Sequence, residues 1–360
     1  MSELDTRRAT EWLLSAQRPL VLLGPECKAS VGGVVAIADR LGAALLTTPD
    51  ALSLVDGARS CGVFSFGASQ HARRSAEACD VVLAFSDLGE FSCRLGEAFR
   101  GKTLIQVSAE ARDGNASVTL REPARSVPAL LNALFAVPSK ACSPWCSHRT
   151  APSVAPVFGA REGLIHPVAA IRAVQAALPE SARICLDVSS AALYAYQYLA
   201  VAARRQRVFS SIERSACMGE ALLASLGVRL ASGLPTLTLV GDCGYSMVAP
   251  EIHTAVELGL GGYVVVVWAN QGGAFIGAGV AQQGIRVPDE VWRFNTPPRF
   301  ASAGDAYGAQ GVRVSDAASL ERALREAFEA PSPVLIEACI DPDVPIPAGD
   351  RFLTLSEARA

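Results

Sequence analysis

The sequence predicts an α/β protein built from two doubly wound parallel-sheet domains. In both halves of the chain, short apolar runs of strand length alternate with longer segments whose apolar residues recur at helical spacing. A stretch rich in proline and serine separates the halves. The chain has 360 residues, 50% of them hydrophobic, which is enough to bury two cores of ordinary domain size. We therefore expect a first domain over residues 1–140, a linker over 141–163, a second domain over 164–345 and a tail over 346–360.

The first half shows this alternation from its start. Gly24 and Pro25 follow the first apolar strand, but no Gly-x-Gly-x-x-Gly pattern continues from them, so the dinucleotide fingerprint is absent. A Rossmann-like domain without that fingerprint is the expectation. The predicted elements are helices over 10–17 and 31–41 and strands over 20–23, 44–47, 81–84 and 104–107.

The second half repeats the pattern. Pro167 suits the first turn of a helix, which we expect to run to about residue 178. The remaining predicted elements are strands over 183–186, 237–240, 263–267 and 334–338, and a helix over 317–329.

Charge and composition exclude several classes of partner. The net charge is −3, the pI is near 5.9, and no basic run is longer than Arg204-Arg205. Nucleic acid and anionic membranes are therefore not expected partners. The first residues lack the apolar core of a signal peptide, and no apolar run approaches the roughly 20 residues that span a bilayer. The sequence is typical of a cytoplasmic protein.

Ten cysteines are scattered through predicted strands and helices, which is typical of reduced, buried thiols. Cys142, Cys146 and His148 form one group with the side chains of a zinc site. A fourth ligand is missing and the stretch is loop-like, so an ordinary loop is favoured over a metal site.

Two polar, glycine-flanked loops follow neighbouring buried strands of the second half. Gly241-Asp242-Cys243-Gly244 ends one strand and Asn270 ends the next. The carboxyl ends of parallel strands meet at one edge of the sheet, so Asp242 and Asn270 are expected to be neighbours.

The chemistry of these loops suits a metal and an anion. The Asp242 carboxylate, the Asn270 amide oxygen and the Gly272 carbonyl are hard ligands of the kind that Mg²⁺ prefers. Gly241 and Gly244 would let the backbone approach an anion, and a helix expected to begin near Met247 would add its positive end. The alternative is an ordinary turn in which Asp242 caps a helix; the paired asparagine favours the metal site.

The spacing of these residues resembles the cofactor signature of the thiamine diphosphate enzymes of the pyruvate decarboxylase, acetohydroxyacid synthase and benzoylformate decarboxylase group. That signature is Gly-Asp-Gly, a helix and a strand, then Asn-Asn. Here Cys243 replaces the third glycine and Ala269 replaces the first asparagine. The resemblance implies thiamine diphosphate as cofactor, with Mg²⁺ held by Asp242, Asn270 and the Gly272 carbonyl. It also implies a central domain in the first half, which binds FAD in some members and is not expected to do so here.

The resemblance extends to further candidate residues. Met218 would be the catalytic wedge that bends the cofactor rings together, with the backbone of Ala216, Cys217 and Met218 holding the aminopyrimidine. Ser190, in the turn that begins at Asp187, would contact the diphosphate. The remaining implied cofactor contacts are Gly241, Cys243, Gly244, Gly273, Phe275 and Ile276. Two alternatives stay open: Ser190 as the cap of a helix, and Met218 as core filler.

The resemblance also bears on function. In the family a first domain supplies the glutamate that activates the cofactor, and only about ten residues precede the first predicted helix here. No carboxylate or histidine lies between Gln271 and Pro288, and Arg286 is the charged side chain there that could pair with an anionic substrate.

We therefore expect the cofactor-anchoring subunit of a split enzyme that decarboxylates or ligates a 2-oxo acid. A second polypeptide would carry the pyrimidine-binding domain and its glutamate, in a hetero-oligomer with two copies of each chain. The alternative is a non-catalytic relative that serves as a binding or scaffold protein.

Overall fold

The computed structural model describes residues 3–65, 68–88, 99–110, 116–138, 145–146, 160–201, 205–210, 212 and 215–347. The chain divides into two compact units. Unit 1 comprises residues 1–152 and 201–204, and unit 2 comprises residues 153–200 and 205–360.

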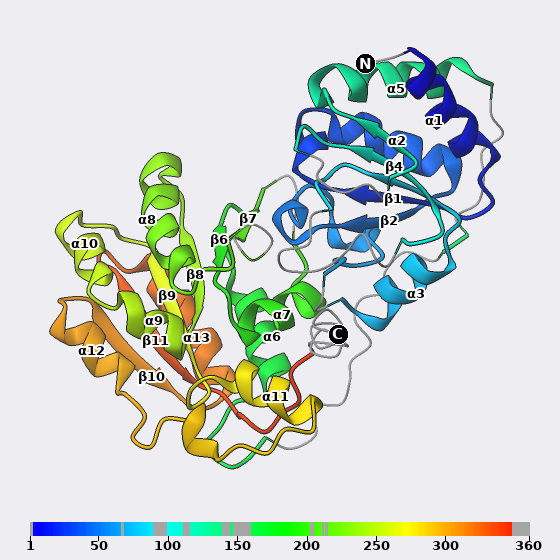
Figure 1. The fold of residues 1–360 in the computed structure, drawn as a ribbon. Helices are drawn as coiled ribbons and strands as arrows, with labels where there is room; N and C mark the ends of the chain where they lie inside the picture. The colour runs from blue at the N-terminus through cyan, green and yellow to red at the C-terminus, as the bar shows by residue number, and fades with distance from the viewer. Residues whose placement is uncertain are drawn as a thin grey trace. The chain divides into compact units, whose positions relative to one another are not determined.

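Unit 1 is a doubly wound α/β domain with five parallel strands in the order β2-β1-β3-β4-β5 (Figure 1). Its order of elements is α1 (Glu3–Ser15), β1 (Pro19–Leu23), α2 (Val31–Leu41), β2 (Ala44–Thr47), α3 (Gln70–Ala78), β3 (Val81–Ala84), β4 (Thr103–Val107), β5 (Val118–Leu120) and α5 (Pro123–Ala136).

Side chains of unit 1 alternate between two cores, one on each face of the sheet. Along β1, Val21 and Leu23 pack in one core together with residues of α1, α2 and α5. Leu20 and Leu22 pack in the other core, together with residues of α3. Successive strand residues point to opposite faces, so a strand buried on both faces reads as an unbroken apolar run.

Unit 2 is a second doubly wound domain, with six parallel strands in the order β10-β11-β9-β8-β6-β7 (Figure 1). Its elements are α6 (Pro167–Ala177), β6 (Arg183–Leu186), α7 (Ser190–Tyr198), β7 (Arg207–Ser210), α8 (Glu220–Ser232), β8 (Thr236–Gly241), α9 (Asp242–Val248), α10 (Glu251–Glu257), β9 (Tyr263–Ala269), α11 (Ala274–Gln282), α12 (Phe300–Ala306), β10 (Gln310–Val314), α13 (Ala317–Glu329) and β11 (Val334–Cys339).

The strand order of unit 2 reverses between β6 and β8. The chain leaves β6 toward β7 at the edge of the sheet and then returns to form β8 on the other side of β6. In open α/β sheets the loops at the carboxyl ends of the two strands flanking such a reversal diverge, and ligands bind between them. The end of β6 and the end of β8 therefore mark the expected binding edge.

The core of unit 2 holds these strand ends in register. Val265 and Val267 of β9 pack with residues of α8, α9, α10 and α12 on one face. On the other face α13 packs against α6 and α6 against α7 (Figure 1). Buried Tyr263 shares a 2.6 Å hydrogen bond with Ser225 of α8, which fixes α8 against the sheet.

The predicted fold class is confirmed, because both sheets are parallel and carry helices on both faces. The sequence did not predict α3, β5 and α5 of unit 1 or β7, α12 and β10 of unit 2. It also placed the start of a helix near Met247, which is wrong: α9 begins at Asp242, directly after the strand. Gly244 lies inside that helix, and glycine lowers helix propensity, so the segment has the composition of a turn.

No helix among the described residues is both long enough and apolar enough to cross a membrane.

Candidate functional site

The predicted loops meet at the carboxyl edge of the unit 2 sheet. Asp242 follows β8 and Asn270 follows β9, and these two strands pair from Thr236–Tyr263 to Gly241–Trp268. The neighbouring β6 ends just before Asp187. Three adjacent strands thus deliver Asp187, Asp242 and Asn270 to one edge, all with buried side chains.

Asp242 is the centre of the hydrogen-bond network at this edge. Its side chain is 2% exposed. Its Oδ2 accepts a 2.7 Å hydrogen bond from the Gly272 amide, and its Oδ1 accepts a 2.8 Å hydrogen bond from the Cys243 amide. Burial raises the pKa of Asp242 to about 6, although hydrogen bonds from Gly272, Cys243 and the Asn270 backbone oppose the rise.

Asn270 links the second loop to α7. Its Nδ2 donates a 3.2 Å hydrogen bond to the Oγ of Ser190, and both side chains are buried. Ser190 is the first residue of α7, whereas Ser189 occupies the cap position and makes no capping hydrogen bond through its side chain. The structure therefore joins Ser190 to the Asn270 loop instead of giving it the capping role that was the alternative.

The loop after Asn270 is held in a conformation that requires glycine. Gln271 and Gly272 have φ angles of 70° and 128°. A Cβ on Gly272 would lie 2.4 Å from the Trp292 carbonyl oxygen. That oxygen accepts a 2.6 Å hydrogen bond from the Gly273 amide, and the Phe294 amide donates to the Gln271 carbonyl at 2.9 Å. The segment 292–294 thus clamps the loop that carries Gly272, a contact that the sequence analysis did not foresee.

Asp187 is a second buried carboxylate at the same edge, and the sequence analysis noted it only as the start of a turn. Its side chain is fully buried, with Oδ2 accepting from the Gly219 amide at 2.9 Å and Oδ1 accepting from the Ala221 amide at 3.1 Å. Burial raises its pKa to about 6 against the effect of these hydrogen bonds. The position of Asp187 directly after an apolar strand was the feature of the sequence that could have identified it as a site residue. Its two partners, more than thirty residues along the chain, were not visible in the sequence.

Asp187 thereby positions the segment that contains Ala216, Cys217 and Met218. Ala216 has a φ of 50°, and Cys217 and Met218 are exposed, Met218 to 41%. Met218 therefore does not fill the core, which was the alternative interpretation. The strained backbone and the exposed thioether are held next to the start of α8 by the Asp187 carboxylate.

The glycines of the β8–α9 turn permit close packing. A Cβ on Gly244 would lie 2.6 Å from Asp187 Oδ2, and a Cβ on Gly241 would lie 3.0 Å from the Ser189 Cβ. Between them, Cys243 is half-buried, and burial together with the Asp242 carboxylate raises the pKa of its thiol to about 11. The Cys243 thiol is therefore neutral near pH 7 and is not activated as a nucleophile.

Phe275 and Ile276 lie in the first turn of α11, directly after the clamped loop. Phe275 is half-buried, whereas Ile276 is 59% exposed. Gly277 packs under the Trp292 indole, since a Cβ there would lie 2.6 Å from the ring. The exposed apolar side chain of Ile276 thus follows the loop that holds Gly272.

The donor atoms at this edge match the chemistry of a hard divalent cation. Asp242 supplies a carboxylate, Asn270 a side-chain amide, and Gly272 a carbonyl. The loop after β8 and the loop after β9 carry these groups and are joined by the hydrogen bond from the Gly272 amide to Asp242. A buried carboxylate with a raised pKa is a group whose ionised form a nearby cation would stabilise. The residues present therefore fit a magnesium ion.

Comparison with known families matches both halves of the chain. Residues 6–130 match the thiamine pyrophosphate enzyme central domain. Residues 187–338 match the thiamine pyrophosphate enzyme C-terminal TPP binding domain.

The chain is also similar to individual proteins over most of its length. The chain is 26% identical over 356 residues to a putative acetolactate synthase large subunit of Mycobacterium tuberculosis, covering 91% of this chain and 61% of the relative. It is 29% identical to a probable 2-ketoarginine decarboxylase of Pseudomonas aeruginosa, covering 92% and 59%. The chain thus spans about three fifths of the length of these relatives.

A solved structure supports the fold. A thiamine diphosphate-dependent 4-hydroxybenzoylformate decarboxylase of Rhodococcus jostii superposes with a TM-score of 0.72 at 20% identity, covering 95% of this chain and 64% of that one. At this identity the similarity establishes the fold alone.

The contact between Gly244 and Asp187 generates a first prediction. Gly244→Ala should lower the free energy of unfolding by about 1–3 kcal/mol, because the new methyl group meets Oδ2 of Asp187, a carboxylate that backbone amides of Gly219 and Ala221 hold in place. Gly227→Ala, in the open interior of α8 with no atom within 4 Å, should instead stabilise by up to about 1 kcal/mol. Urea denaturation of the two variants measures the difference, and equal midpoints would contradict the contact.

The buried Asp187 carboxyl generates a second prediction, on pH. Its pKa in the fold is about 6 against an ordinary 3.8, so the folded state holds the proton more tightly than the unfolded state does. The tighter proton binding by Asp187 therefore stabilises the folded state fully below pH 4. This stabilisation is lost as the pH rises through 6.

The measurement compares the chain with Asp187→Asn, both free of metal and cofactor, by denaturation at pH 4 and pH 7. The unfolding free energy of the wild-type chain should fall relative to that of the variant by on the order of 2 kcal/mol between these pH values. A difference that stays constant or grows in favour of the wild-type chain as the pH rises would show that the fold does not raise the pKa of Asp187.

Proposed function

Because the chain belongs to the thiamine pyrophosphate enzyme family through its central and C-terminal domains, we propose that it is the cofactor-anchoring subunit of an enzyme that acts on a 2-oxo acid. The reaction would be decarboxylation, with or without ligation of the acyl group to a second carbonyl compound. The relatives support this class, since one is named an acetolactate synthase large subunit and another a decarboxylase.

The observation that carries the proposal is the buried Asp242 carboxylate in contact with the Asn270–Gly272 loop. In the proposal Asp242, Asn270 and the Gly272 carbonyl would hold Mg²⁺, which would supply positive charge for the diphosphate of thiamine diphosphate. The diphosphate would lie against the residues that line the adjoining turns, namely Ser190, Gly241, Cys243, Gly244 and Gly273.

The chain would hold and shield the reactive end of the cofactor through two exposed apolar residues. Met218 would pack against the cofactor rings and keep them bent, while the Ala216 carbonyl and the Met218 amide hold the aminopyrimidine. Ile276, exposed beside the clamped loop, would exclude water. Thiamine diphosphate, when bound, supplies the nucleophilic carbon and the electron sink that cleavage next to a ketone requires.

A second wall of the site would come from a partner. Three apolar side chains on the segments that follow β7, β8 and β9 are exposed, namely Met218, Met247 and Ile276, and exposed apolar residues are expected at an interface. The segment 271–288 carries no carboxylate or histidine. In the proposal the activating glutamate comes from a pyrimidine-binding domain on a second polypeptide, in a hetero-oligomer with two copies of each chain.

The proposal is tested by activity with and without a partner. The purified chain is incubated with Mg²⁺, thiamine diphosphate and a panel of 2-oxo acids, alone and with a polypeptide that carries a pyrimidine-binding domain, while CO₂ release is followed. We expect no turnover by the chain alone and turnover by the complex, because neither activation of the cofactor nor exclusion of water is complete without the second wall.

Two results would contradict the proposal. Turnover by this chain alone would rule out the need for a partner. Silence with every pyrimidine-binding polypeptide that forms a complex would favour a non-catalytic binding or scaffold role.

A further inference from the structure

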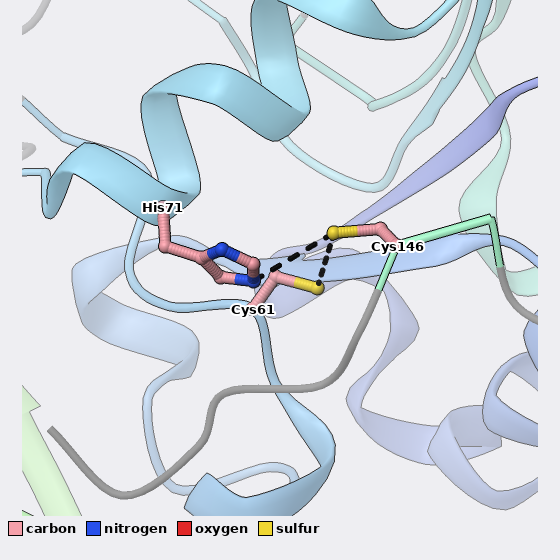
Figure 2. A group of neighbouring side chains, drawn as sticks. All are labelled: Cys61, His71 and Cys146. Carbon is pink, nitrogen blue, oxygen red and sulfur yellow. Dashed lines mark hydrogen bonds between the residues drawn. The ribbon is translucent and has the colours of Figure 1, made fainter. Parts of the chain in front are cut away.

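A group of metal-binding side chains lies in unit 1, apart from the site of unit 2. Cys61, His71 and Cys146 place their ligand atoms within 4.8 Å of one another (Figure 2). Cys146 Sγ is 3.6 Å from Cys61 Sγ and 3.6 Å from His71 Nε2.

Three separate segments position these side chains. Cys61 is fully buried, and its amide donates to the Leu45 carbonyl of β2 at 2.7 Å. His71 lies in the first turn of α3, a helix whose N-terminus is capped by the Ser69 hydroxyl, which accepts from the Ala72 amide at 3.2 Å. Cys61 is hydrogen-bonded to a strand, and His71 lies in a helix. These two side chains therefore form a preorganised pair, to which Cys146 is added.

Cys146 is brought to this pair by its neighbour in sequence. The Trp145 indole Nε1 donates to the Pro19 carbonyl at 2.7 Å, and the Trp145 amide donates to the Gly42 carbonyl at 3.3 Å. Trp145 and Cys146 both pack against the core on the α3 face of the sheet. The Ser75 hydroxyl, one turn along α3 from His71, donates to the His71 carbonyl at 2.9 Å, and its Oγ lies 3.1 Å from Cys146 Sγ.

The two distances from Cys146 match those of a tetrahedral zinc site. With Zn–S bonds of about 2.3 Å and Zn–N bonds of about 2.0–2.1 Å, two sulfurs at tetrahedral corners lie about 3.8 Å apart, and a sulfur and a nitrogen about 3.5 Å apart. The two measured distances from Cys146 Sγ are both 3.6 Å. A Cys₂His set of soft thiolate and imidazole donors selects Zn²⁺ over the hard cation that suits Asp242.

We propose that Cys61, His71 and Cys146 bind a zinc ion, with a water molecule in the fourth position. His71 and Cys146 are only partly buried, which leaves a path for the metal and room for the water. The ion ties the Trp145-Cys146 segment to α3 and to the Cys61 segment beside β2, and so fixes Trp145 and Cys146 on unit 1.

The sequence analysis grouped Cys146 with Cys142 and His148, which lie outside the described residues. The described partners of Cys146 are instead 75 and 85 residues away along the chain. No short-range spacing pattern could have shown them.

The test measures zinc binding by the full chain, purified with reduced thiols in the presence of Mg²⁺ and thiamine diphosphate. We expect about one zinc per chain by metal analysis, and a thiolate-to-cobalt absorption band when Co²⁺ replaces zinc. His71→Asn and Cys146→Ser, at partly buried positions, should each weaken zinc binding at least about tenfold. A chelator that binds zinc in strong preference to magnesium, added with Mg²⁺ in excess, should lower the melting temperature of the wild-type chain and leave that of His71→Asn unchanged.

Two control variants separate this site from other thiols and from the site of unit 2. Cys79→Ser removes a buried thiol from the same core, where the Sγ of Cys79 contacts the Ala76 carbonyl, and should leave zinc binding intact. Asp242→Asn should also retain the zinc.

Three results would overturn the proposal: a wild-type chain with reduced thiols that binds no zinc, equal zinc affinity in His71→Asn and the wild-type chain, or loss of zinc in Asp242→Asn. A Cys61–Cys146 disulfide that mass spectrometry finds in place of bound metal under reducing conditions would overturn it as well.

Discussion

The site of unit 2 depends on the burial of the Asp242 carboxylate. A charge removed from water is costly unless hydrogen bonds or an opposite charge compensate it. Here the amides of Gly272 and Cys243 donate to its two oxygens, yet its pKa remains raised to about 6. The hydrogen bonds therefore offset only part of the free-energy cost of burying the charged carboxylate. A divalent cation beside Asp242 would supply the rest, which is why the proposal places the metal there.

Parallel strand pairing makes this arrangement possible. The register that joins β8 to β9 ends with Gly241 opposite Trp268, so the loops after these strands begin side by side. Close backbone approaches then fix the loops: Gly272 lies against the Trp292 carbonyl and Gly244 against Asp187. At these positions glycine is needed because any side chain would collide with an atom that is itself hydrogen-bonded.

Much of this could be predicted from the sequence because it rests on local patterns. Short apolar runs predicted the strands Ala44–Thr47 and Val81–Ala84 with their observed ends. The adjacency of Asp242 and Asn270 followed from the rule that parallel strands end at one edge. The dual acceptor role of Asp187, the clamp by Trp292 and the approach of Cys146 to His71 could not be predicted, because each joins segments far apart in the chain. The start of α9 was misplaced because a glycine in its first turn opposes helix formation, and tertiary packing overrides that local preference.

The central claim is that Asp242 anchors a metal–diphosphate pair, and calorimetric titration of thiamine diphosphate into the chain with Mg²⁺ tests it most directly. The titration compares the wild-type chain with Asp242→Ala and, as a matched control in the same turn, with Cys243→Gly, alone and with the partner present. The account predicts Mg²⁺-dependent binding by the wild-type chain and by Cys243→Gly, and no binding by Asp242→Ala. Unchanged cofactor affinity in Asp242→Ala would contradict it.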